Sequence, residues 1–267
     1  MTGERPPQAA LRIVAWNIRA GGGRRREGIA AQLRAWNPDV VALSEFRGTA
    51  ASRALAEALA DAGWSQQRTS AAARPPEDRE NALLVASRWP LQRHSLRRMP
   101  QNPRRWLLTR IAVPEERGGP LILGAMHAPN EVTGHKWPLL DALLETVRHW
   151  RGGAGLMIGD TNTGRPQLDE ESPVFGQRHQ AWMEAMHRRW PDAHRLHAGE
   201  EARAYTWYSP NAGNGFRLDQ AFLHPSLAAR LLGIHHIWGV SGGVASRRGE
   251  LSDHAALVVD FAARPLR

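Results

Sequence analysis

The stretch Leu251-Ser252-Asp253-His254 runs directly into the apolar segment Ala255 to Phe261 near the end of the chain. A short, continuous apolar run of this kind predicts a buried strand. A carboxylate and an imidazole at the entrance of such a strand cost free energy unless the protein uses them. The stretch therefore predicts both a core strand and a functional site where that strand begins.

Similar apolar runs occur along the whole chain, and most carry a polar side chain at one end. The predicted strands and these side chains are 11–16 with Asn17, 39–45 with Glu45, 121–127 with His127, 156–160 with Asp160 and Asn162, and 218–223 with Asp219. Apolar spacing predicts further strands over 81–87, 105–113 and 205–208 and helices over 28–36, 49–62, 136–150 and 179–190, whereas 65–79 is expected to be an exposed loop. Because strand ends and their loops carry function in layered folds, the polar side chains are expected to converge on one pocket.

Composition limits the class of protein. With 267 residues, 42% of them apolar, the chain can build a sizeable core, and without repeats or a linker it is expected to form one domain over 11–267 after a flexible segment 1–10. The absence of cysteine excludes disulfides and thiol chemistry, so any metal must be bound by oxygen or imidazole. No apolar run is long enough for a membrane span, and we expect a cytoplasmic monomer.

The net charge of +9, from 35 basic and 26 acidic residues, favours an anionic partner, with nucleic acid as the leading candidate. The same excess would also serve as simple solubilising charge. Charge alone therefore leaves both explanations open.

The polar set suits the hydrolysis of a phosphate ester. Glu45, Asn17 and Asp253 offer hard oxygen ligands for Mg²⁺ or Mn²⁺, which can neutralise a phosphate oxygen and stabilise a leaving alkoxide. No covalent nucleophile is needed for this chemistry.

Proton transfer and charge stabilisation fall to the remaining residues. His254 could take a proton from water while Asp219 orients its ring. Three further side chains could donate hydrogen bonds where charge develops on the phosphate oxygens, namely His127, Asn130 and Asn162.

Taken singly, these residues also have structural explanations. Asn17 fits a turn before the glycines, Glu45 fits a surface carboxylate, and Asp160 with Asn162 fits an Asx-turn. His127 alone fits a half-buried core histidine. The functional interpretation depends on all of them occurring in one order.

That order resembles the endonuclease/exonuclease/phosphatase superfamily from about Leu11 to Phe261. The motifs that carry the resemblance are Trp16-Asn17, Leu43-Ser44-Glu45, Met126-His127-Ala128-Pro129-Asn130, Gly159-Asp160-Thr161-Asn162, Arg217-Leu218-Asp219 and Ser252-Asp253-His254. The resemblance implies a four-layer α/β sandwich, in which two packed mixed β-sheets are flanked by helices, and metal-dependent hydrolysis of phosphoester bonds.

The resemblance also implies a role for each matching residue. Glu45 is the main metal ligand with Asn17 and Asp253 near the ion, Asp219 and His254 are the carboxylate–histidine pair, Asp160 aligns the water or protonates the leaving oxygen with Asn162 as its partner, and His127 faces the phosphate. Three positions depart from the pattern. Thr161 replaces a phenylalanine, Gln220 replaces a tyrosine, and Arg19 stands where abasic endonucleases carry Asp or Asn, which disfavours a second metal.

The choice of substrate depends on weaker features. Trp207, Phe216 and Leu218 resemble the apolar sugar pocket of exonuclease III-like abasic endonucleases. Lys136, the arginines 24–26 and the basic segment 93–105 are expected to contact a phosphate backbone, although the run 24–26 equally fits a solvated loop.

We therefore predict a metal-dependent DNA phosphodiesterase, most similar to abasic endonucleases and exonucleases. The alternative is a phosphatase or phosphodiesterase that acts on a small or lipid headgroup. A non-catalytic binder is disfavoured, because it would not need the full set of Glu45, Asp160, Asn162, Asp219 and His254.

Overall fold

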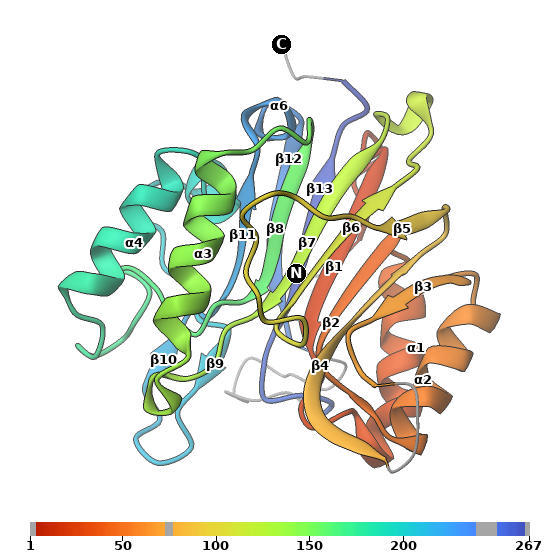
Figure 1. The fold of residues 1–267 in the computed structure, drawn as a ribbon, viewed down its shortest axis with the longest axis horizontal. Helices are drawn as coiled ribbons and strands as arrows, with labels where there is room; N and C mark the ends of the chain where they lie inside the picture. Colours follow the sequence, from red (N-terminus) through yellow and green to blue (C-terminus); the bar gives the residue numbers. More distant parts are fainter. Residues whose placement is uncertain (1–3, 73–76, 239–249, 265–267) are drawn as a thin grey trace.

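Two β-sheets pack face to face in the computed structural model of the chain, which describes residues 4–72, 77–238 and 250–264 (Figure 1). The six-stranded sheet has the order β12 (Leu231–Ile237), β13 (Ala256–Phe261), β1 (Leu11–Asn17), β2 (Val40–Gly48), β4 (Asp78–Ser87) and β3 (Gln66–Thr69). The five-stranded sheet has the order β11 (Asp219–Leu223), β8 (Gly155–Asp160), β7 (Leu121–His127), β6 (Trp106–Ile111) and β5 (Leu91–Arg93). A separate two-stranded ribbon pairs β9 (Trp207–Tyr208) with β10 (Gly215–Phe216).

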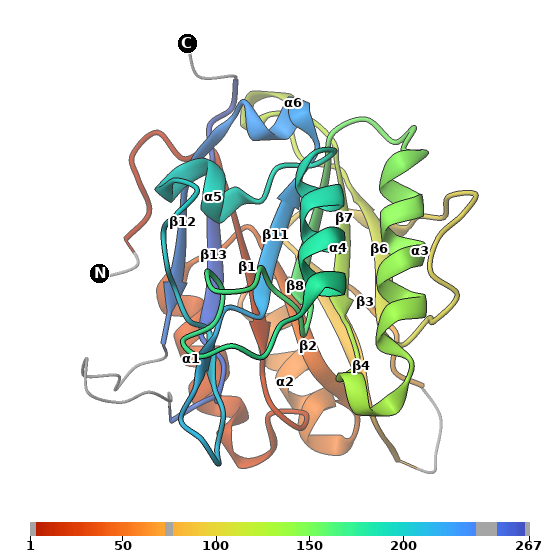
Figure 2. The same cartoon turned by 90° about the vertical axis from the view of Figure 1, so that its left-hand side faces the viewer.

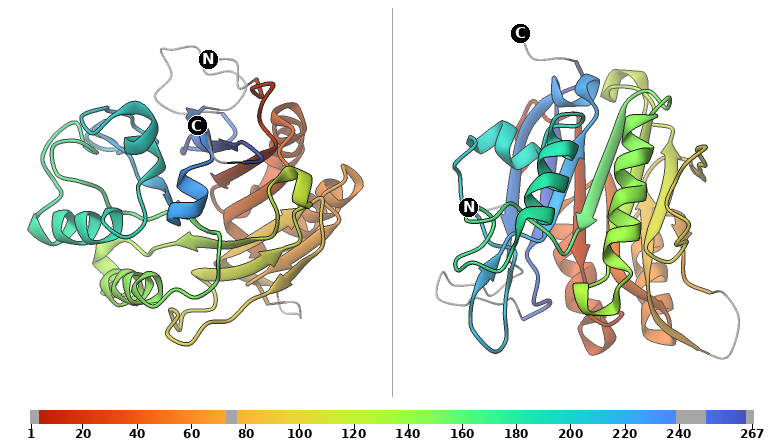
Figure 3. Two further views of the ribbon diagram at one scale, coloured as in Figure 1. Left: turned by 90° about the horizontal axis from the view of Figure 1, so that it is seen from above. Right: turned by 60° about the vertical axis from the view of Figure 1, so that its left-hand side comes forward.

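Helices cover the outer face of each sheet. The pair α1 (Arg26–Trp36) and α2 (Ala50–Asp61) packs on the six-stranded sheet, and the pair α3 (Lys136–Arg148) and α4 (Gln177–His187) packs on the five-stranded sheet. Figure 2 shows α3 and α4 next to each other, and Figure 3 shows both sheets between the two helix pairs. The shorter helices are η1 (Gly23–Arg25), η2 (Glu115–Arg117), η3 (Glu131–Thr133), α5 (Ala193–Ala198) and α6 (Pro225–Ala228). This arrangement confirms the predicted four-layer sandwich of two mixed sheets.

Alternating side chains on β1 show how the sequence builds these layers. Leu11, Ile13 and Ala15 point into the core between the sheets, while Val14 and Trp16 point into the core beneath α1 and α2. Full burial of an aliphatic or aromatic side chain contributes about 1.5–3 kcal/mol. A strand that is apolar on both faces is therefore stable only between two layers, which explains the continuous apolar runs in the sequence.

The strand pairing brings the predicted polar residues to one end of the sandwich. β1 and β2 are parallel with Asn17 opposite Ser44, and β7 and β8 are parallel with His127 opposite Asp160. In the antiparallel pair β11 and β8, Asp219 lies opposite Asp160. Register alone thus places several of the functional side chains together.

The loop predicted over 65–79 is wrong in part, because it contains β3 and the first residues of β4. β3 has the sequence Gln66-Gln67-Arg68-Thr69 and lies at the edge of the sheet, where polar side chains are tolerated and give no apolar signal. α5, α6 and β5 were not predicted either. No helix in the described part of the chain is long and apolar enough to cross a lipid bilayer.

The N-terminal segment predicted to be flexible is described only from residue 4. There, Arg5 Nη2 lies 2.6 Å from Asp39 Oδ2, and Ala9 is buried. Residues 1–3 lie outside the described residues, so the flexibility of 1–10 stays a prediction.

Candidate active site

A cavity of about 340 Å³ opens where β2, β7 and β8 end. It is lined by Glu45, Asn81, Arg105, His127, Pro129, Asn130, Thr133, Asp160, Asn162, Trp207, Leu218, Asp253 and His254. Nine of the thirteen predicted site residues are in this lining. Of the other four, Asn17, Asp219 and Phe216 contact lining residues, and Lys136 lies elsewhere.

Glu45 reaches the cavity because β2 is irregular at that residue. The pairing of β2 with β4 shifts register between Ser44 and Phe46, and Glu45 itself has φ of 57°. Such a bulge redirects a side chain, and a strained backbone of this kind costs about 1–3 kcal/mol. Burial opposes ionisation of Glu45, but its pKa lies below the ordinary value, and the N–H donors of Ala20 and Asn17 and the charge of His254 favour the carboxylate.

The donor atoms around Glu45 fit a hard divalent cation. Glu45 and Asp253 both present carboxylates to the cavity, and Mg²⁺ and Mn²⁺ prefer oxygen ligands. Asn17 lies behind them: its Nδ2 donates to Glu45 Oε1 at 3.3 Å and to Asp160 Oδ2 at 3.1 Å, and its Oδ1 accepts the Arg19 N–H. In this geometry Asn17 links Glu45 to Asp160, and its predicted place near the ion stays a prediction. Arg19 Nε lies 4.0 Å from Asp253 Oδ2, so a cationic side chain occupies this edge of the site.

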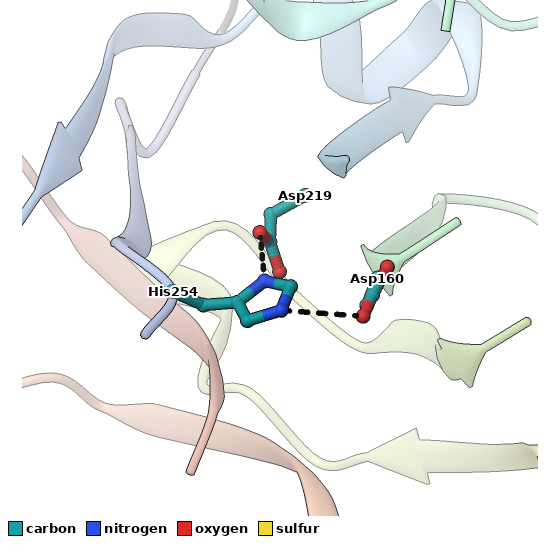
Figure 4. A group of neighbouring side chains, drawn as sticks. All are labelled: Asp160, Asp219 and His254. Carbon is teal, nitrogen blue, oxygen red and sulfur yellow. Dashed lines mark hydrogen bonds and ion pairs between the residues drawn. The ribbon is translucent and has the colours of Figure 1, made fainter. Parts of the chain in front are cut away.

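A carboxylate–imidazole pair, Asp219 and His254, lies next to Asp160 (Figure 4). His254 Nδ1 lies 2.9 Å from Asp219 Oδ2, and its Nε2 lies 3.9 Å from Asp160 Oδ2. Burial lowers the pKa of His254, but Asp219, followed by Asp160 and Asp253, raises it to about 9. Burial raises the pKa of Asp160 to about 7, so this carboxyl holds a proton in part of the molecules at neutral pH.

Asp160, Asp219 and His254 also form a cluster compact enough to hold a metal, with their ligand atoms within 4.8 Å of one another. A metal on the Nε2 of His254 would compete with a proton, because the pKa of this ring is raised to about 9. Glu45 and Asp253 offer oxygen atoms alone, which Mg²⁺ and Mn²⁺ prefer to imidazole.

Local hydrogen bonds fix the carboxylate–imidazole pair. The Asp219 N–H donates to Thr206 Oγ1 at 3.1 Å, and the His254 N–H donates to Ser252 Oγ at 3.1 Å. Ser252 in turn donates to the carbonyl of Asn17 at the end of β1. The stretch before β13 is thus fastened to the neighbouring strand that carries Asn17.

The position of Asp160 depends on the glycine before it. Gly159 has φ of +134°, and a Cβ on it would lie 2.2 Å from the carbonyl oxygen of Met126. Asn162 follows with φ of 47°, and its N–H donates to Asp160 Oδ1 at 2.9 Å. The Asx-turn considered as a structural explanation is therefore present, and the same turn supports two residues of the cavity wall.

The two departures close to Asp160 stabilise the same loop. Thr161 Oγ1 donates to the carbonyl of Leu218 at 2.9 Å and lies 3.1 Å from the carbonyl of Thr163, and Gln220 Nε2 donates to the carbonyl of Thr163 at 2.7 Å. Both side chains are buried beneath the cavity. Their hydrogen bonds join the loop after Asp160 to the segment before β11.

Arg105 was not predicted as a single site residue, and it determines which ring nitrogen of His127 carries the hydrogen. Arg105 Nη1 donates to His127 Nδ1 at 2.9 Å. Because a guanidinium has no acceptor atom, Nδ1 must carry the lone pair, and the neutral ring carries its hydrogen on Nε2. Burial, together with the charge of Arg105, lowers the pKa of His127 to about 3. His127 is therefore a neutral hydrogen-bond donor at physiological pH, and the only sequence signal for Arg105 was its place in the basic segment 93–105.

The predicted substrate contacts divide into two groups. Trp207 and Leu218 line the cavity, and Phe216 packs against Trp207 with ring centroids 5.9 Å apart. Lys136 is only 3% exposed, lies 3.2 Å from His179 Nε2 and is outside the cavity lining, so its predicted contact with a phosphate backbone is not supported. Burial also lowers the pKa of its ammonium group.

One arginine of the run 24–26, Arg25, forms hydrogen bonds with backbone carbonyls close to the site. Arg25 Nη1 donates to the carbonyl of Leu251 at 2.5 Å, and its Nη2 donates to the carbonyl of Arg19 at 2.6 Å. Part of the predicted backbone contact is therefore a structural contact within the chain.

Comparison with known proteins supports the fold and the motif order. The profile of the Endonuclease/Exonuclease/phosphatase family matches residues 14–254. No curated protein matches the chain in sequence. Among solved structures, an AP endonuclease from Archaeoglobus fulgidus has a TM-score of 0.74 at 20% identity, over 94% of this chain and 99% of its own. The 3′-5′ exonuclease NExo from Neisseria meningitidis has a TM-score of 0.69 at 19% identity, over 94% of this chain and 100% of its own. A 3′ phosphatase NExo variant bound to a product DNA hairpin has a TM-score of 0.69 at 18% identity, over 94% and 99%.

Proposed function

This chain belongs to the Endonuclease/Exonuclease/phosphatase family, and we propose that it is a phosphodiesterase that hydrolyses DNA with Mg²⁺ or Mn²⁺. The observation that carries the proposal is one cavity in which Glu45 and Asp253 lie beside the Asp219–His254 pair and Asp160. DNA as the substrate is supported by the net charge of +9 and by structural neighbours described as an AP endonuclease and as a NExo variant bound to DNA.

The residues of the cavity divide the reaction between them. An ion held by Glu45 and Asp253 would neutralise a phosphate oxygen and stabilise the leaving alkoxide. Asp219 holds the His254 ring so that Nε2 faces the cavity, and in its neutral form this nitrogen accepts the proton of the attacking water. Asp160, when protonated, donates to the leaving oxygen.

Two neutral donors complete the phosphate site. Nε2–H of His127 is set by the Arg105 contact, and Asn130 lines the same cavity. Hydrogen-bond donors fixed before the reaction stabilise the charge that develops on the phosphate oxygens. Asn162 lines the cavity as well, although its Nδ2 already donates to the carbonyl of Ala128 at 2.7 Å.

Within this proposal, an abasic endonuclease or exonuclease is the activity most similar in motif, with a 3′-hydroxyl product. Trp207 and Leu218, with Phe216 behind Trp207, give the cavity an apolar wall against which an extruded sugar could pack. A cytoplasmic location and a monomeric state stay predictions from the sequence.

The direct test is hydrolysis of supercoiled plasmid and of an abasic duplex by the purified protein. We expect cleavage with Mg²⁺ or Mn²⁺ and none after a chelator is added, and we expect Glu45→Gln to lose activity while Glu57→Gln, an exposed site on α2, keeps it. If both DNAs stay intact while a small or lipid headgroup phosphoester is hydrolysed, the DNA assignment is wrong.

A further inference from the structure

A second hollow lies beside the catalytic cavity and has the opposite charge. It has a volume of about 570 Å³, and its lining includes Arg47, Arg79, Arg104 and Arg105 but only one acidic residue, Glu80. We refer to it as the arginine groove. Its volume exceeds that of the catalytic cavity, at about 340 Å³.

The arginine groove and the catalytic cavity adjoin. Asn81, Arg105, Pro129 and Thr133 line both of them. A molecule bound at the reacting groups therefore has a direct path into the groove. A substrate that ended at the scissile phosphate would leave the groove empty.

The four arginines differ in how far their charge is already neutralised. Arg104 is bonded to Asp78 and lies 2.9 Å from Glu80 Oε2, so it is paired twice. Arg79 is exposed and forms no ion pair with a described residue. Asp78 and Glu80 are thus both paired with Arg104, and no ion pair among the described residues offsets Arg79.

Arg47 and Arg105 are held by neutral partners. Arg47 Nε donates to Asn81 Oδ1 at 2.8 Å, and Arg105 Nη1 donates to His127 Nδ1 at 2.9 Å. Neither arginine has an ion pair among the described residues. Each keeps further guanidinium N–H groups for an anion, and guanidinium binds phosphate with two parallel hydrogen bonds.

The catalytic cavity and the groove differ in the charges of their linings. The cavity lining contains the carboxyl groups of Glu45, Asp160 and Asp253, whereas the groove lining contains four arginines and one carboxylate. Fixed positive charge beside an acidic site raises the local concentration of an anionic substrate.

We propose that the arginine groove binds a second phosphate of the DNA strand, next to the phosphate that is cleaved. This inference rests on the proposed function, since it assigns a subsite for the same substrate. The groove extends beyond the reacting groups, and its Arg47 and Arg79 have no ion pair among the described residues, so it fits a chain with repeated phosphates better than a lone headgroup.

The test compares two substrates that share the reacting group and differ in length. Arg47→Ala/Arg79→Ala should lower kcat/KM for plasmid or abasic duplex about 10-fold and reduce the slope of log KM against log salt by about 1. Hydrolysis of bis(p-nitrophenyl) phosphate, which has no second phosphate, should change by less than about twofold. Arg34→Ala/Arg151→Ala removes the same charge from exposed positions outside the groove and should change neither activity.

Each other result contradicts the inference in a different way. Equal losses on DNA and on bis(p-nitrophenyl) phosphate would show an effect on the reacting groups, and an unchanged DNA activity would show an unused groove. If the double variant loses activity only on a third substrate, a polyphosphorylated polyol, the groove binds a small polyanion and not DNA. Wild-type protein that cleaves the small diester but no DNA would refute the DNA assignment itself, before any variant is compared. Arg79→Ala, at an exposed position, replaces the double variant if that variant does not fold.

Discussion

The catalytic cavity and the arginine groove share four residues, yet they are built in different ways. The cavity takes its reacting groups from strand ends whose positions follow from register, and most of these side chains are buried. The groove takes its charges from more exposed residues at the end of β2, the start of β4 and the segment before β6. β2 supplies both regions, with Glu45 in the cavity and Arg47 in the groove. Strand register thus fixes the positions of the reacting groups, whereas attraction of the substrate depends on more exposed arginines at the ends of strands and in a loop.

The variant expected to distinguish the catalytic cavity from the arginine groove most clearly is His254→Ala. Loss of the imidazole removes proton transfer from every substrate, so kcat should fall about 10²–10⁴-fold on both DNA and bis(p-nitrophenyl) phosphate. The groove variants should affect DNA alone. Steady-state rates on both substrates measure this difference, and binding of DNA by His254→Ala with wild-type salt dependence is the control. A loss on DNA alone would place His254 in substrate recognition.

Arg105 joins the two regions, so its replacement should affect both. Arg105→Ala removes the charge and the hydrogen bond that keep His127 neutral with its hydrogen on Nε2, and the pKa of His127 should rise from about 3 toward its ordinary value. We expect about a 10-fold loss of kcat on bis(p-nitrophenyl) phosphate, since one donor to the phosphate is disturbed. NMR titration of the His127 ring measures the pKa directly.

Two variants serve as comparisons for Arg105. Arg105→Lys keeps the charge but loses the guanidinium fork, and it should recover part of the small-diester activity. Arg34→Ala should leave the His127 titration unchanged. A His127 pKa that stays near 3 in Arg105→Ala would show that burial alone keeps the ring neutral.

Short, continuous apolar runs predicted most of the core strands, and the resemblance carried by the motif order implied the four-layer sandwich. Strands such as β1 and β13 are apolar on both faces, a pattern that only a layered structure satisfies. β3 could not be predicted in the same way, because its four residues are polar and pair at an edge. Only its pairing with β4 in the structure identifies this segment as a strand.

The candidate site was predictable where chemistry and register coincide, and less so elsewhere. Glu45 and Asp160 stand at the end of apolar runs and His254 stands just before one, and the structure places all three in the cavity lining. Lys136 and Arg105 show the limit. Both are basic residues near a motif, but Lys136 is buried against His179 and is not in the cavity lining, whereas Arg105 follows the turn at Asn102 and lines the cavity. That difference depends on tertiary packing, which spacing does not report.

The smallest expected effect is on the free energy of unfolding, to which the charged Asp219–His254 pair of the cavity contributes. His254 has its pKa raised to about 9 in the folded chain against an ordinary value of 6.5, so the folded state binds its proton more tightly than the unfolded state does. The Asp219–His254 pair therefore contributes stability that is complete below about pH 6.5 and is lost as the pH rises through 9. Asp219→Asn should lower the free energy of unfolding of the metal-free protein by up to about 3 kcal/mol at pH 6, and the difference should shrink toward pH 9.

Urea unfolding in the presence of a chelator, at pH values from 6 to 9.5, measures this dependence. Arg79→Ala is the matched change in the arginine groove, and its exposed charge should give less than about 0.5 kcal/mol with no trend over the same range. The comparison between the regions then extends from activity to stability, because ionisation of the buried pair is coupled to folding while the exposed charge in the groove is not. An Asp219→Asn difference that stays constant from pH 6 to 9.5 would mean that His254 is neutral in the metal-free protein, and the division of charge between cavity and groove would have to be redrawn.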